Sequence, residues 1–239
     1  MAATPRIPRR ILVLDVGGSH VKFRFNARGP IGKFVSGRRL NPARLLAGLR
    51  PRLKGRRFEA VSIGYPGVVF RGRIVAEPHH LARGWVGFDF ARALGAPVRI
   101  INDAAMQALG SYAGGRMLFL GLGTGLGITL ILDGQIEPTE LGHMPYRHGH
   151  TYEDYLGERG RKRRGTKKWR RRVAQITAHL KAALEVDYVV IGGGNAGRLK
   201  QLPAGARRGS NRNAFVGGVR LWQLRGSVLP ARARRGGAR

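Results

Sequence analysis

Asn102 and Asp103 are the residues of this chain best suited to chemistry, because they stand between a short apolar segment and a segment typical of a helix. A carboxylate at the end of a strand can take a proton from a bound hydroxyl group, as general bases do. Asp103 is therefore the candidate general base. The alternative is that Asp103 only caps the helix that follows, for which aspartate is among the preferred residues.

Three glycine-rich segments follow apolar runs: Asp15-Val16-Gly17-Gly18-Ser19, Gly121 to Gly127 around Thr124, and Gly192-Gly193-Gly194. Glycine lets backbone N–H groups approach phosphate oxygens, so the first two are candidate phosphate-binding loops. Ser19 would add a hydroxyl donor, and Asp15 could hold Mg²⁺ through water, because this ion prefers oxygen ligands. For the first segment the alternative is a simple hairpin turn. Neither loop has the Gly-Lys-Ser/Thr spacing of a P-loop.

Apolar runs and turn residues predict the elements that must position these groups. In the first half we expect an antiparallel meander of strands over 11–16, 21–25 and 31–36, a helix opened by Asn41 and Pro42, a strand over 59–64, a short helix over 88–94 and a strand over 98–101. The second half repeats this outline, with a helix over 103–112, strands over 117–121 and 127–132, a long helix over 167–184 and a strand over 188–191. The repetition indicates two α/β lobes with a cleft between them.

The composition narrows the functional class. The 239 residues carry a formal net charge of +31, mostly from arginine. This charge predicts a polyanionic partner or substrate; the alternative is a generally basic proteome or an adaptation for solubility. The absence of cysteine excludes disulfides, thiolate zinc sites and a cysteine nucleophile. No apolar run approaches the roughly 20 residues that cross a bilayer, and the run at 11–14 is too short for a signal peptide. We therefore expect a soluble cytoplasmic protein that does not bind membranes.

Taken in order, these motifs resemble those of the ROK sugar kinases, and among them the bacterial polyphosphate glucokinases. The segments at 15–19 and 123–127 look like the two phosphate motifs of the family, and Asn102-Asp103 looks like its sugar-binding Asn and catalytic Asp. Glu140-Leu141-Gly142-His143 matches the E-x-G-H segment, and Glu153 falls where the family has a further sugar-contacting Glu. The polyphosphate branch is favoured by residues 140–157, 167–170, 187–196 and 213–218.

The resemblance implies a fold and a domain organisation. It implies an α/β protein with the two-lobed, actin-like ATPase (ribonuclease H-like) sugar kinase fold and a cleft between the lobes. The lobes would span residues 1–102 and 103–211, with a C-terminal helix near 212–222 rejoining the first lobe. The basic tail at 225–239 has little to bury, and we expect it to be disordered.

The resemblance also implies a reaction, the transfer of a phosphoryl group from inorganic polyphosphate or ATP to the 6-hydroxyl of glucose, with mannose as an alternative acceptor. Asp103 would be the catalytic base. The sugar would be held by Asn102, Glu140, His143, Glu153 and Gly67. The phosphate donor would be held by Asp15, Gly17, Gly18, Ser19, Lys22, Gly123, Thr124, Gly125, Gly193 and Gly194. We expect Mg²⁺ as cofactor and a homodimer as assembly.

Two departures from the family pattern affect these expectations. Most ROK proteins carry a cysteine-rich zinc motif after the E-x-G-H segment, whereas residues 146–150 here contain no cysteine. We therefore expect no structural zinc; a site made of His143, His148 and His150 is the alternative. His80 stands where relatives often have Asn before a Trp, which leaves the sugar selectivity open.

Residues 159–172 form a basic run in which ten of the fourteen residues are Lys or Arg. This run could guide a polyphosphate chain through Lys167, Lys168, Arg170, Arg171 and Arg172, or it could simply be a solvated helix face. The rival function is a nucleic-acid-binding protein or a ROK-type transcriptional regulator that keeps the sugar-binding fold. For a kinase we expect nucleic acid to bind only as a nonspecific polyanion.

Overall fold

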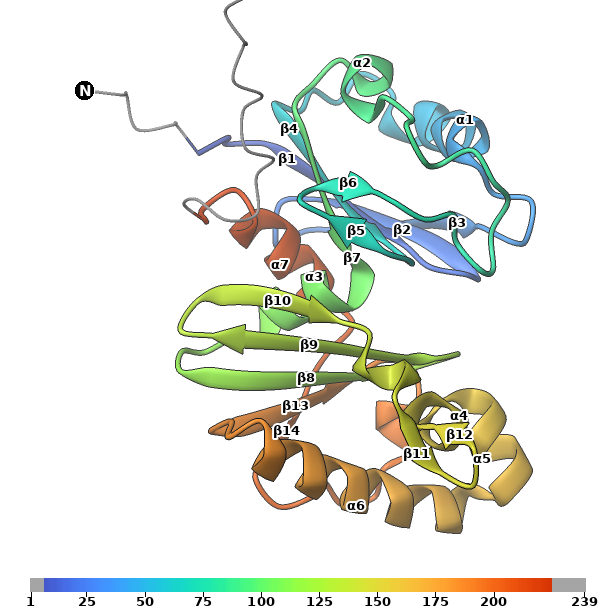
Figure 1. Ribbon diagram of the computed structural model, residues 1–239. Helices are drawn as coiled ribbons and strands as arrows, with labels where there is room; N and C mark the ends of the chain where they lie inside the picture. The colour runs from blue at the N-terminus through green and yellow to red at the C-terminus, as the bar shows by residue number, and fades with distance from the viewer. Residues whose placement is uncertain (1–6, 225–239) are drawn as a thin grey trace, which may run out of the picture. The chain divides into compact units, whose positions relative to one another are not determined.

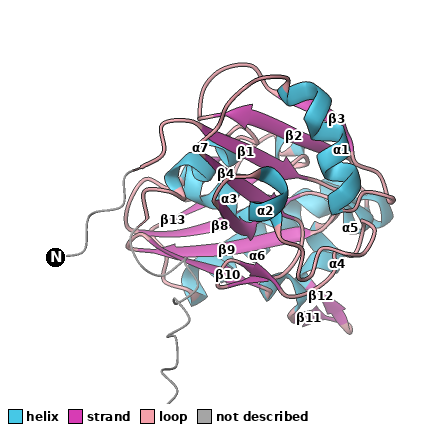
Figure 2. Ribbon diagram, turned by 90° about the horizontal axis from the view of Figure 1, so that it is seen from above, coloured by secondary structure: helices cyan, strands magenta, loops and turns pink. Residues whose placement is uncertain are grey.

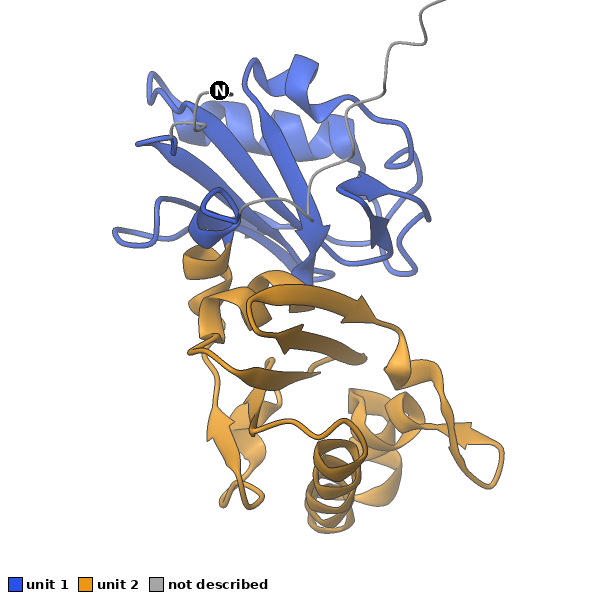
Figure 3. Cartoon of the chain, turned by 60° about the vertical axis from the view of Figure 1, so that its left-hand side comes forward, with its two compact units in different colours: residues 1–103, 218–239 blue, residues 104–217 orange. Residues whose placement is uncertain are grey.

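The computed structural model describes residues 7–224 (Figure 1), so the predicted tail at 225–239 lies outside the described residues. The chain divides into two compact units (Figure 3). Unit 1 comprises residues 1–103 and 218–239, and unit 2 comprises residues 104–217. Each unit contains a five-stranded sheet. Figure 2 shows the strands in magenta and the helices in cyan.

The sheet of unit 1 has the strand order β3-β2-β1-β4-β7. Its strands are β1 (Ile11–Val16), β2 (His20–Phe25), β3 (Gly32–Val35), β4 (Ala60–Tyr65) and β7 (Val98–Asn102). The first three strands form the predicted antiparallel meander, and β4 and β7 run parallel to β1. Every residue of β1 and β4 is buried, as expected for strands covered on both faces.

Two helices and a small hairpin complete most of unit 1. Helix α1 (Pro42–Leu53) begins as predicted, because the Asn41 side chain accepts a hydrogen bond from the Arg44 amide and Pro42 occupies the first turn. Helix α2 (Phe90–Leu94) and the hairpin of β5 (Val69–Phe70) and β6 (Arg73–Ile74) lie in the connection between β4 and β7. The hairpin was not predicted, because two-residue strands leave no periodic pattern in the sequence.

The sheet of unit 2 has the order β10-β9-β8-β13-β14, which repeats the topology of unit 1. Its strands are β8 (Arg116–Leu122), β9 (Leu126–Leu132), β10 (Gln135–Thr139), β13 (Tyr188–Gly192) and β14 (Ala206–Arg208). Again an antiparallel meander is followed by two strands parallel to its first member. The predicted repetition of the first half in the second is confirmed.

The helices of unit 2 include α6 (Thr166–Ala183), which buries Trp169, Val173, Ile176 and Leu180 at helical spacing in the core of the unit. Before it come the short elements η1 (Leu141–His143), β11 (Pro145–Arg147), β12 (His150–Thr151), α4 (Tyr152–Leu156) and α5 (Glu158–Arg164). After β13 comes the short turn η2 (Ala196–Arg198). None of the helices within residues 7–224 is long and apolar enough to cross a membrane.

Two helices contain residues of both units. Helix α3 (Asp103–Ser111) begins at the last residue of the first segment of unit 1 and continues in unit 2. Helix α7 (Asn213–Arg220) ends in unit 1, where the Gly218 carbonyl accepts a hydrogen bond of 2.6 Å from the Ser62 hydroxyl.

Candidate active site

The chemistry-bearing residues of unit 1 gather at one edge of its sheet. Strands β1, β4 and β7 are parallel neighbours, with Asp15 paired to Gly64 and Tyr65 paired to Asn102. The carboxyl ends of the three strands therefore lie together, as at the ligand-binding edge of open α/β sheets. With neighbouring strands about 4.8 Å apart, the ends of β1 and β7 are separated by roughly 10 Å.

Asn102 is fixed at this edge by the loop that follows β4. Its side-chain amide donates a hydrogen bond of 3.1 Å to the carbonyl of Gly67. A Cβ atom on Gly67 would lie 2.7 Å from the ring of Tyr65, so glycine is required for this close approach. Tyr65 is itself buried and donates from its hydroxyl to the Ala76 carbonyl. The predicted sugar-binding residues Gly67 and Asn102 are thus direct neighbours.

Asp103 is the first residue of α3 and is partly buried. It lies between the end of β7 and the first turn of the helix, where the sequence predicted it. A carboxylate in the first turn is favoured by the helix dipole. Its position therefore suits the predicted general base and also helps to start the helix.

The turn between β1 and β2 is held by Ser36. The Ser36 hydroxyl donates to the carbonyl of Gly17 at 2.7 Å, and the Ser36 amide donates to the carbonyl of Ser19 at 3.1 Å. A Cβ on Gly18 would stand 3.8 Å from the Cβ of His80. His80 therefore borders the first glycine turn.

Asp15 and Lys22 face each other across β1 and β2 and form an ion pair of 3.6 Å. Asp15 is 6% exposed, and burial raises the pKa of its carboxyl group while the charge of Lys22 opposes this rise. Magnesium ions at phosphate sites commonly use one or two carboxylates together with oxygens of the phosphates. Asp15 suits the role of a single carboxylate that would hold the ion through water. Lys22 beside it suits the role of a cation for phosphate.

In unit 2, two glycine segments leave the same edge of the sheet. Strands β8 and β13 are parallel neighbours, with Gly121 paired to Gly192. Gly193 has a positive φ of 83°, and a Cβ there would lie 2.4 Å from the carbonyl oxygen of Leu122. The segment at 193–195 therefore packs directly against residues 122–123 at the start of the second glycine loop, and the two segments form one glycine-lined edge.

The predicted sugar-binding residues of unit 2 form a cluster beside this edge. His143 Nδ1 lies 3.1 Å from a carboxylate oxygen of Glu140, and His143 Nε2 lies 3.9 Å from a carboxylate oxygen of Glu153. Glu153 also accepts a hydrogen bond of 2.9 Å from the Leu126 amide. A Cβ on Gly125 would stand 2.4 Å from Glu153 Oε2, so Glu153 lies against the second glycine loop. All three side chains are at least 38% exposed, which leaves them accessible to a ligand.

An aromatic cluster occupies the segment where relatives would carry their cysteine-rich motif. Tyr146 stacks on Tyr152 with ring centroids 5.0 Å apart and meets Tyr155 edge-on at 5.1 Å. Within residues 7–224, no group of three or more His, Cys, Asp or Glu side chains is arranged to hold a metal ion. His150 instead lies 3.7 Å from the carboxylate of Asp154, whose pKa is lowered by hydrogen bonds from Thr151.

Asn195 and Glu158 are residues that the sequence did not single out for the site. The Asn195 side-chain amide donates to the carbonyl of Gly123 at 3.1 Å and to the carboxylate of Glu158 at 2.9 Å. Glu158 also accepts two hydrogen bonds from the guanidinium of Arg161, and these contacts lower the pKa of its carboxyl group to about 2. The three-residue spacing of Glu158 and Arg161 was a usable signal at the start of the basic run.

The cations of the basic run differ in their surroundings. Arg170 donates to the carbonyl of Arg198, while Arg164 and Arg172 lie over the ring of Tyr155. Lys167, Lys168 and Arg171 are exposed.

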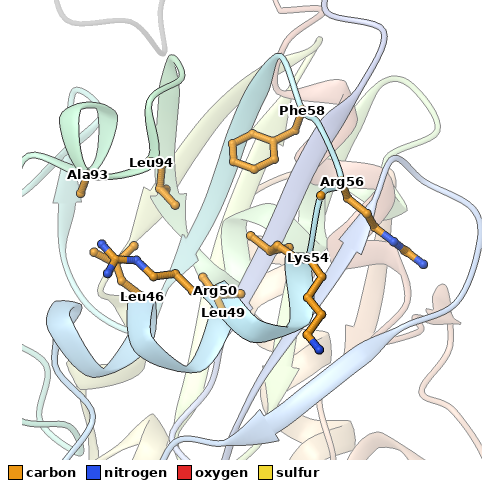
Figure 4. Close-up of a pocket in the computed structure, with 10 residues that line it drawn as sticks. Leu46, Leu49, Arg50, Lys54, Arg56, Phe58, Ala93 and Leu94 are labelled. Carbon is orange, nitrogen blue, oxygen red and sulfur yellow. The ribbon is translucent and has the colours of Figure 1, made fainter.

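A cavity of about 230 Å³ lies in unit 1 at the end of α1 (Figure 4). Apolar residues and three cationic residues line it, and the full lining consists of Leu46, Leu49, Arg50, Leu53, Lys54, Gly55, Arg56, Phe58, Ala93 and Leu94. None of the predicted site residues lines this cavity.

Comparisons with solved structures connect this fold to sugar kinases. An inorganic polyphosphate/ATP-glucomannokinase from Arthrobacter sp. strain KM matches with a TM-score of 0.76 at 22% identity, covering 91% of this chain and 99% of the other. A ROK family glucokinase from Streptomyces griseus, solved with glucose and AMPPNP, matches with a TM-score of 0.74 at 16% identity, covering 89% and 98%. A ROK family transcriptional regulator, a homologue of the E. coli MLC protein, matches with a TM-score of 0.62 at 15% identity, covering 91% and 81%.

The sequence itself matches one family model. A search of curated proteins found no significant match. The model described as the ROK family matches residues 49–162, a segment that contains Asn102, Asp103, Glu140, His143 and Glu153. The resemblance predicted from the sequence is confirmed: residues 49–162 match the ROK family model, and the chain has the fold of the ROK sugar kinases.

Proposed function

We propose that this protein transfers a phosphoryl group from inorganic polyphosphate or ATP to the 6-hydroxyl of glucose. The observation that carries the proposal is the pair Asn102-Asp103 at the carboxyl edge of β7, on the same sheet edge as Asp15 and the first glycine turn. This edge offers a base for a hydroxyl group and a phosphate-binding turn in one unit. Kinases need both.

In the proposed mechanism, amide, imidazole and carboxylate groups hold the hydroxyls of the sugar. The candidates for this role are Asn102 and the loop at Gly67 in unit 1, and Glu140, His143 and Glu153 in unit 2. The exposed carboxylates beside His143 support this assignment, because neighbouring carboxylates can accept hydrogen bonds from the adjacent hydroxyls of a sugar. Asp103 would accept the proton of the 6-hydroxyl as that oxygen bonds to the terminal phosphorus atom of the donor, while the phosphoanhydride P–O bond breaks and the shortened polyphosphate or ADP leaves.

The transferring phosphoryl group requires positive charge and N–H donors around it. Ser19, Lys22 and the turn at Gly17 and Gly18 would supply these in unit 1. Thr124 and the glycine segments at 123–125 and 193–194 would supply them in unit 2. Magnesium, held through water by Asp15, would neutralise charge on the phosphates when bound.

For a polyphosphate donor, the exposed cations at the start of α6 would extend the binding surface. Lys167, Lys168 and Arg171 suit this role better than Arg170 and Arg172, which contact groups of the protein itself. The predicted homodimer and cytoplasmic location stay predictions.

The test is the formation of glucose 6-phosphate by the purified protein, measured with polyphosphate and with ATP in separate reactions. Glucose and mannose serve as alternative acceptors, and 6-deoxyglucose, which lacks the attacking hydroxyl, is the control. We expect product from glucose with at least one donor and none from 6-deoxyglucose. No sugar phosphate with either donor would refute the proposal.

The second candidate function is binding to nucleic acid, favoured by the net charge of +31 and by the likeness to a ROK family regulator. A gel shift on random DNA across a range of salt concentrations distinguishes the two functions when run on the sample used for the kinase assay. A nonspecific contact weakens steeply with salt. A sequence-selective complex in a sample without kinase activity would favour the regulator.

A further inference from the structure

We propose that Asn195 and Glu158 are positioning residues for the phosphate donor, because they lock the two glycine segments of unit 2 into a single surface. The inference rests on the proposed function. It assigns to these residues a share in donor binding without direct contact to the reacting atoms.

Asn195 joins the two glycine segments. Its backbone amide donates to the carbonyl of Leu122 at 2.8 Å, directly before the second glycine loop. Its side-chain nitrogen donates to the carbonyl of Gly123, and its side-chain oxygen accepts a hydrogen bond of 3.0 Å from Arg198. Since Asn195 is only 7% exposed, these polar groups would have few other partners. The amide therefore has one orientation, with nitrogen toward Gly123 and oxygen toward Arg198.

Glu158 completes the connection from the other side. Its backbone amide donates to the carbonyls of Gly123 and Thr124 at 3.1 and 3.2 Å, while its carboxylate accepts from Asn195. Arg161 holds the same carboxylate through two nitrogens, at 2.8 and 2.6 Å. Bidentate pairs of this kind fix geometry as well as charge.

The consequence concerns the carbonyl oxygens of the second glycine loop. Carbonyl oxygens repel an anion, whereas backbone N–H groups attract it. Donors from Asn195 and Glu158 occupy the carbonyls of Gly123 and Thr124 and hold them in one direction. A loop whose carbonyls are held in this way can keep its remaining groups ordered for phosphate, which lowers the cost of binding.

The substitution Asn195→Asp tests the proposal with almost no change of volume. It replaces the donating nitrogen with an oxygen that faces the Gly123 carbonyl and the Glu158 carboxylate. We expect the KM for tripolyphosphate and for ATP to rise about tenfold or more, the order expected for losing a hydrogen bond to a charged group. The KM for glucose should change little. Lowering the pH should partly restore the donor KM, because two adjacent carboxylates share a proton readily.

Two further variants control the experiment. In the double variant Asn195→Asp/Glu158→Gln, the new amide can donate to the new carboxylate, so part of the donor affinity should return and the restoration at low pH should disappear. Asn211→Asp makes the same chemical change at an exposed position of the same unit and should leave both KM values unchanged. If Asn195→Asp does not fold, the KM for the donor is measured instead on the double variant and on Glu158→Gln alone, and these values decide the proposal.

An unchanged donor KM in folded Asn195→Asp, or equal increases in the KM for donor and for glucose, would overturn the proposal. If the unmodified protein makes no glucose 6-phosphate, the proposed function has failed. Calorimetric binding of tripolyphosphate to the same variants then decides the inference: equal binding by Asn195→Asp and the unmodified protein contradicts it, and weaker binding supports it.

Discussion

The carboxylates of this chain fall into two kinds, which differ in their hydrogen-bond partners and exposure. The sequence has only 13 acidic residues against 44 Lys and Arg. Glu77 accepts hydrogen bonds from the amides of Gly84, Trp85 and Val86, and Glu158 is held by Arg161 and Asn195. Both have a lowered pKa, whereas the exposed Glu140 and Glu153 surround a histidine. The first kind holds loops in place, and the second kind is available to a ligand.

Gly67 provides a prediction at the residue scale. We expect Gly67→Ala to weaken glucose binding and to lower stability by about 1–3 kcal/mol, because the new Cβ would overlap the buried ring of Tyr65. The loop would have to move away from Asn102. Calorimetry with glucose and thermal unfolding measure the two effects. Gly197→Ala is the matched control, since a Cβ there meets nothing within 4 Å. Unaltered glucose affinity in Gly67→Ala would contradict the role of this loop.

Glu158 provides a prediction about pH. Its pKa is lowered from 4.5 to about 2 in the folded protein, so its contribution to stability is present above pH 4.5 and is lost as the pH falls toward 2. Glu158→Gln lacks this contribution. The difference in unfolding midpoint between the unmodified protein and Glu158→Gln should therefore shrink over this interval. A difference that stays constant from pH 5 to pH 2 would show that the carboxylate is not coupled to folding.

At the scale of elements, both units carry their candidate residues at the carboxyl ends of parallel strands in sheets of identical order. In each unit the first glycine segment is the hairpin turn that follows the first strand of the sheet, after β1 in unit 1 and after β8 in unit 2. The repeated topology explains why the two predicted phosphate motifs occur at corresponding positions of the chain.

The sequence predicted the long apolar strands and α6, because burial on both faces or along one helix face leaves a clear pattern. It did not predict α5, because the cations at 159–164 mask any apolar periodicity, or α4, which is only five residues long. It singled out Asn102, Asp103 and the glycine segments as candidate site residues, because amide, carboxylate and glycine residues at strand ends are typical of binding sites. Their roles stay predictions. Glu158 was missed because its role depends on Asn195, which is 37 residues away and meets it only in the folded chain.

The exposed face of α6 carries a prediction at the element scale. Replacing Lys167, Lys168 and Arg171 by Gln should raise the KM for long-chain polyphosphate more than the KM for ATP, since only a long chain can reach beyond the glycine edge. The effect should diminish at high salt. Arg170→Gln/Arg172→Gln is the comparison, and it should lower the unfolding midpoint more, because these side chains contact the Arg198 carbonyl and Tyr155. Equal effects on both donors would exclude a polyphosphate track.

At the scale of the whole molecule, the net charge of +31 favours any polyanion, so affinity for polyphosphate or nucleic acid alone does not identify the function. A turnover measurement identifies the function, because turnover requires the sugar, the donor and the base together. The match to the ROK family model and the sugar kinase fold supply the framework, and Asp103 is the residue on which the proposed chemistry depends.

The most direct test compares glucose 6-phosphate formation by the unmodified protein and by Asp103→Asn, with glucose affinity measured calorimetrically on the same samples. A general base contributes about 10² to 10⁴ in rate. We predict that Asp103→Asn loses turnover by this order and keeps its glucose affinity. Turnover by Asp103→Asn close to that of the unmodified protein would contradict the account.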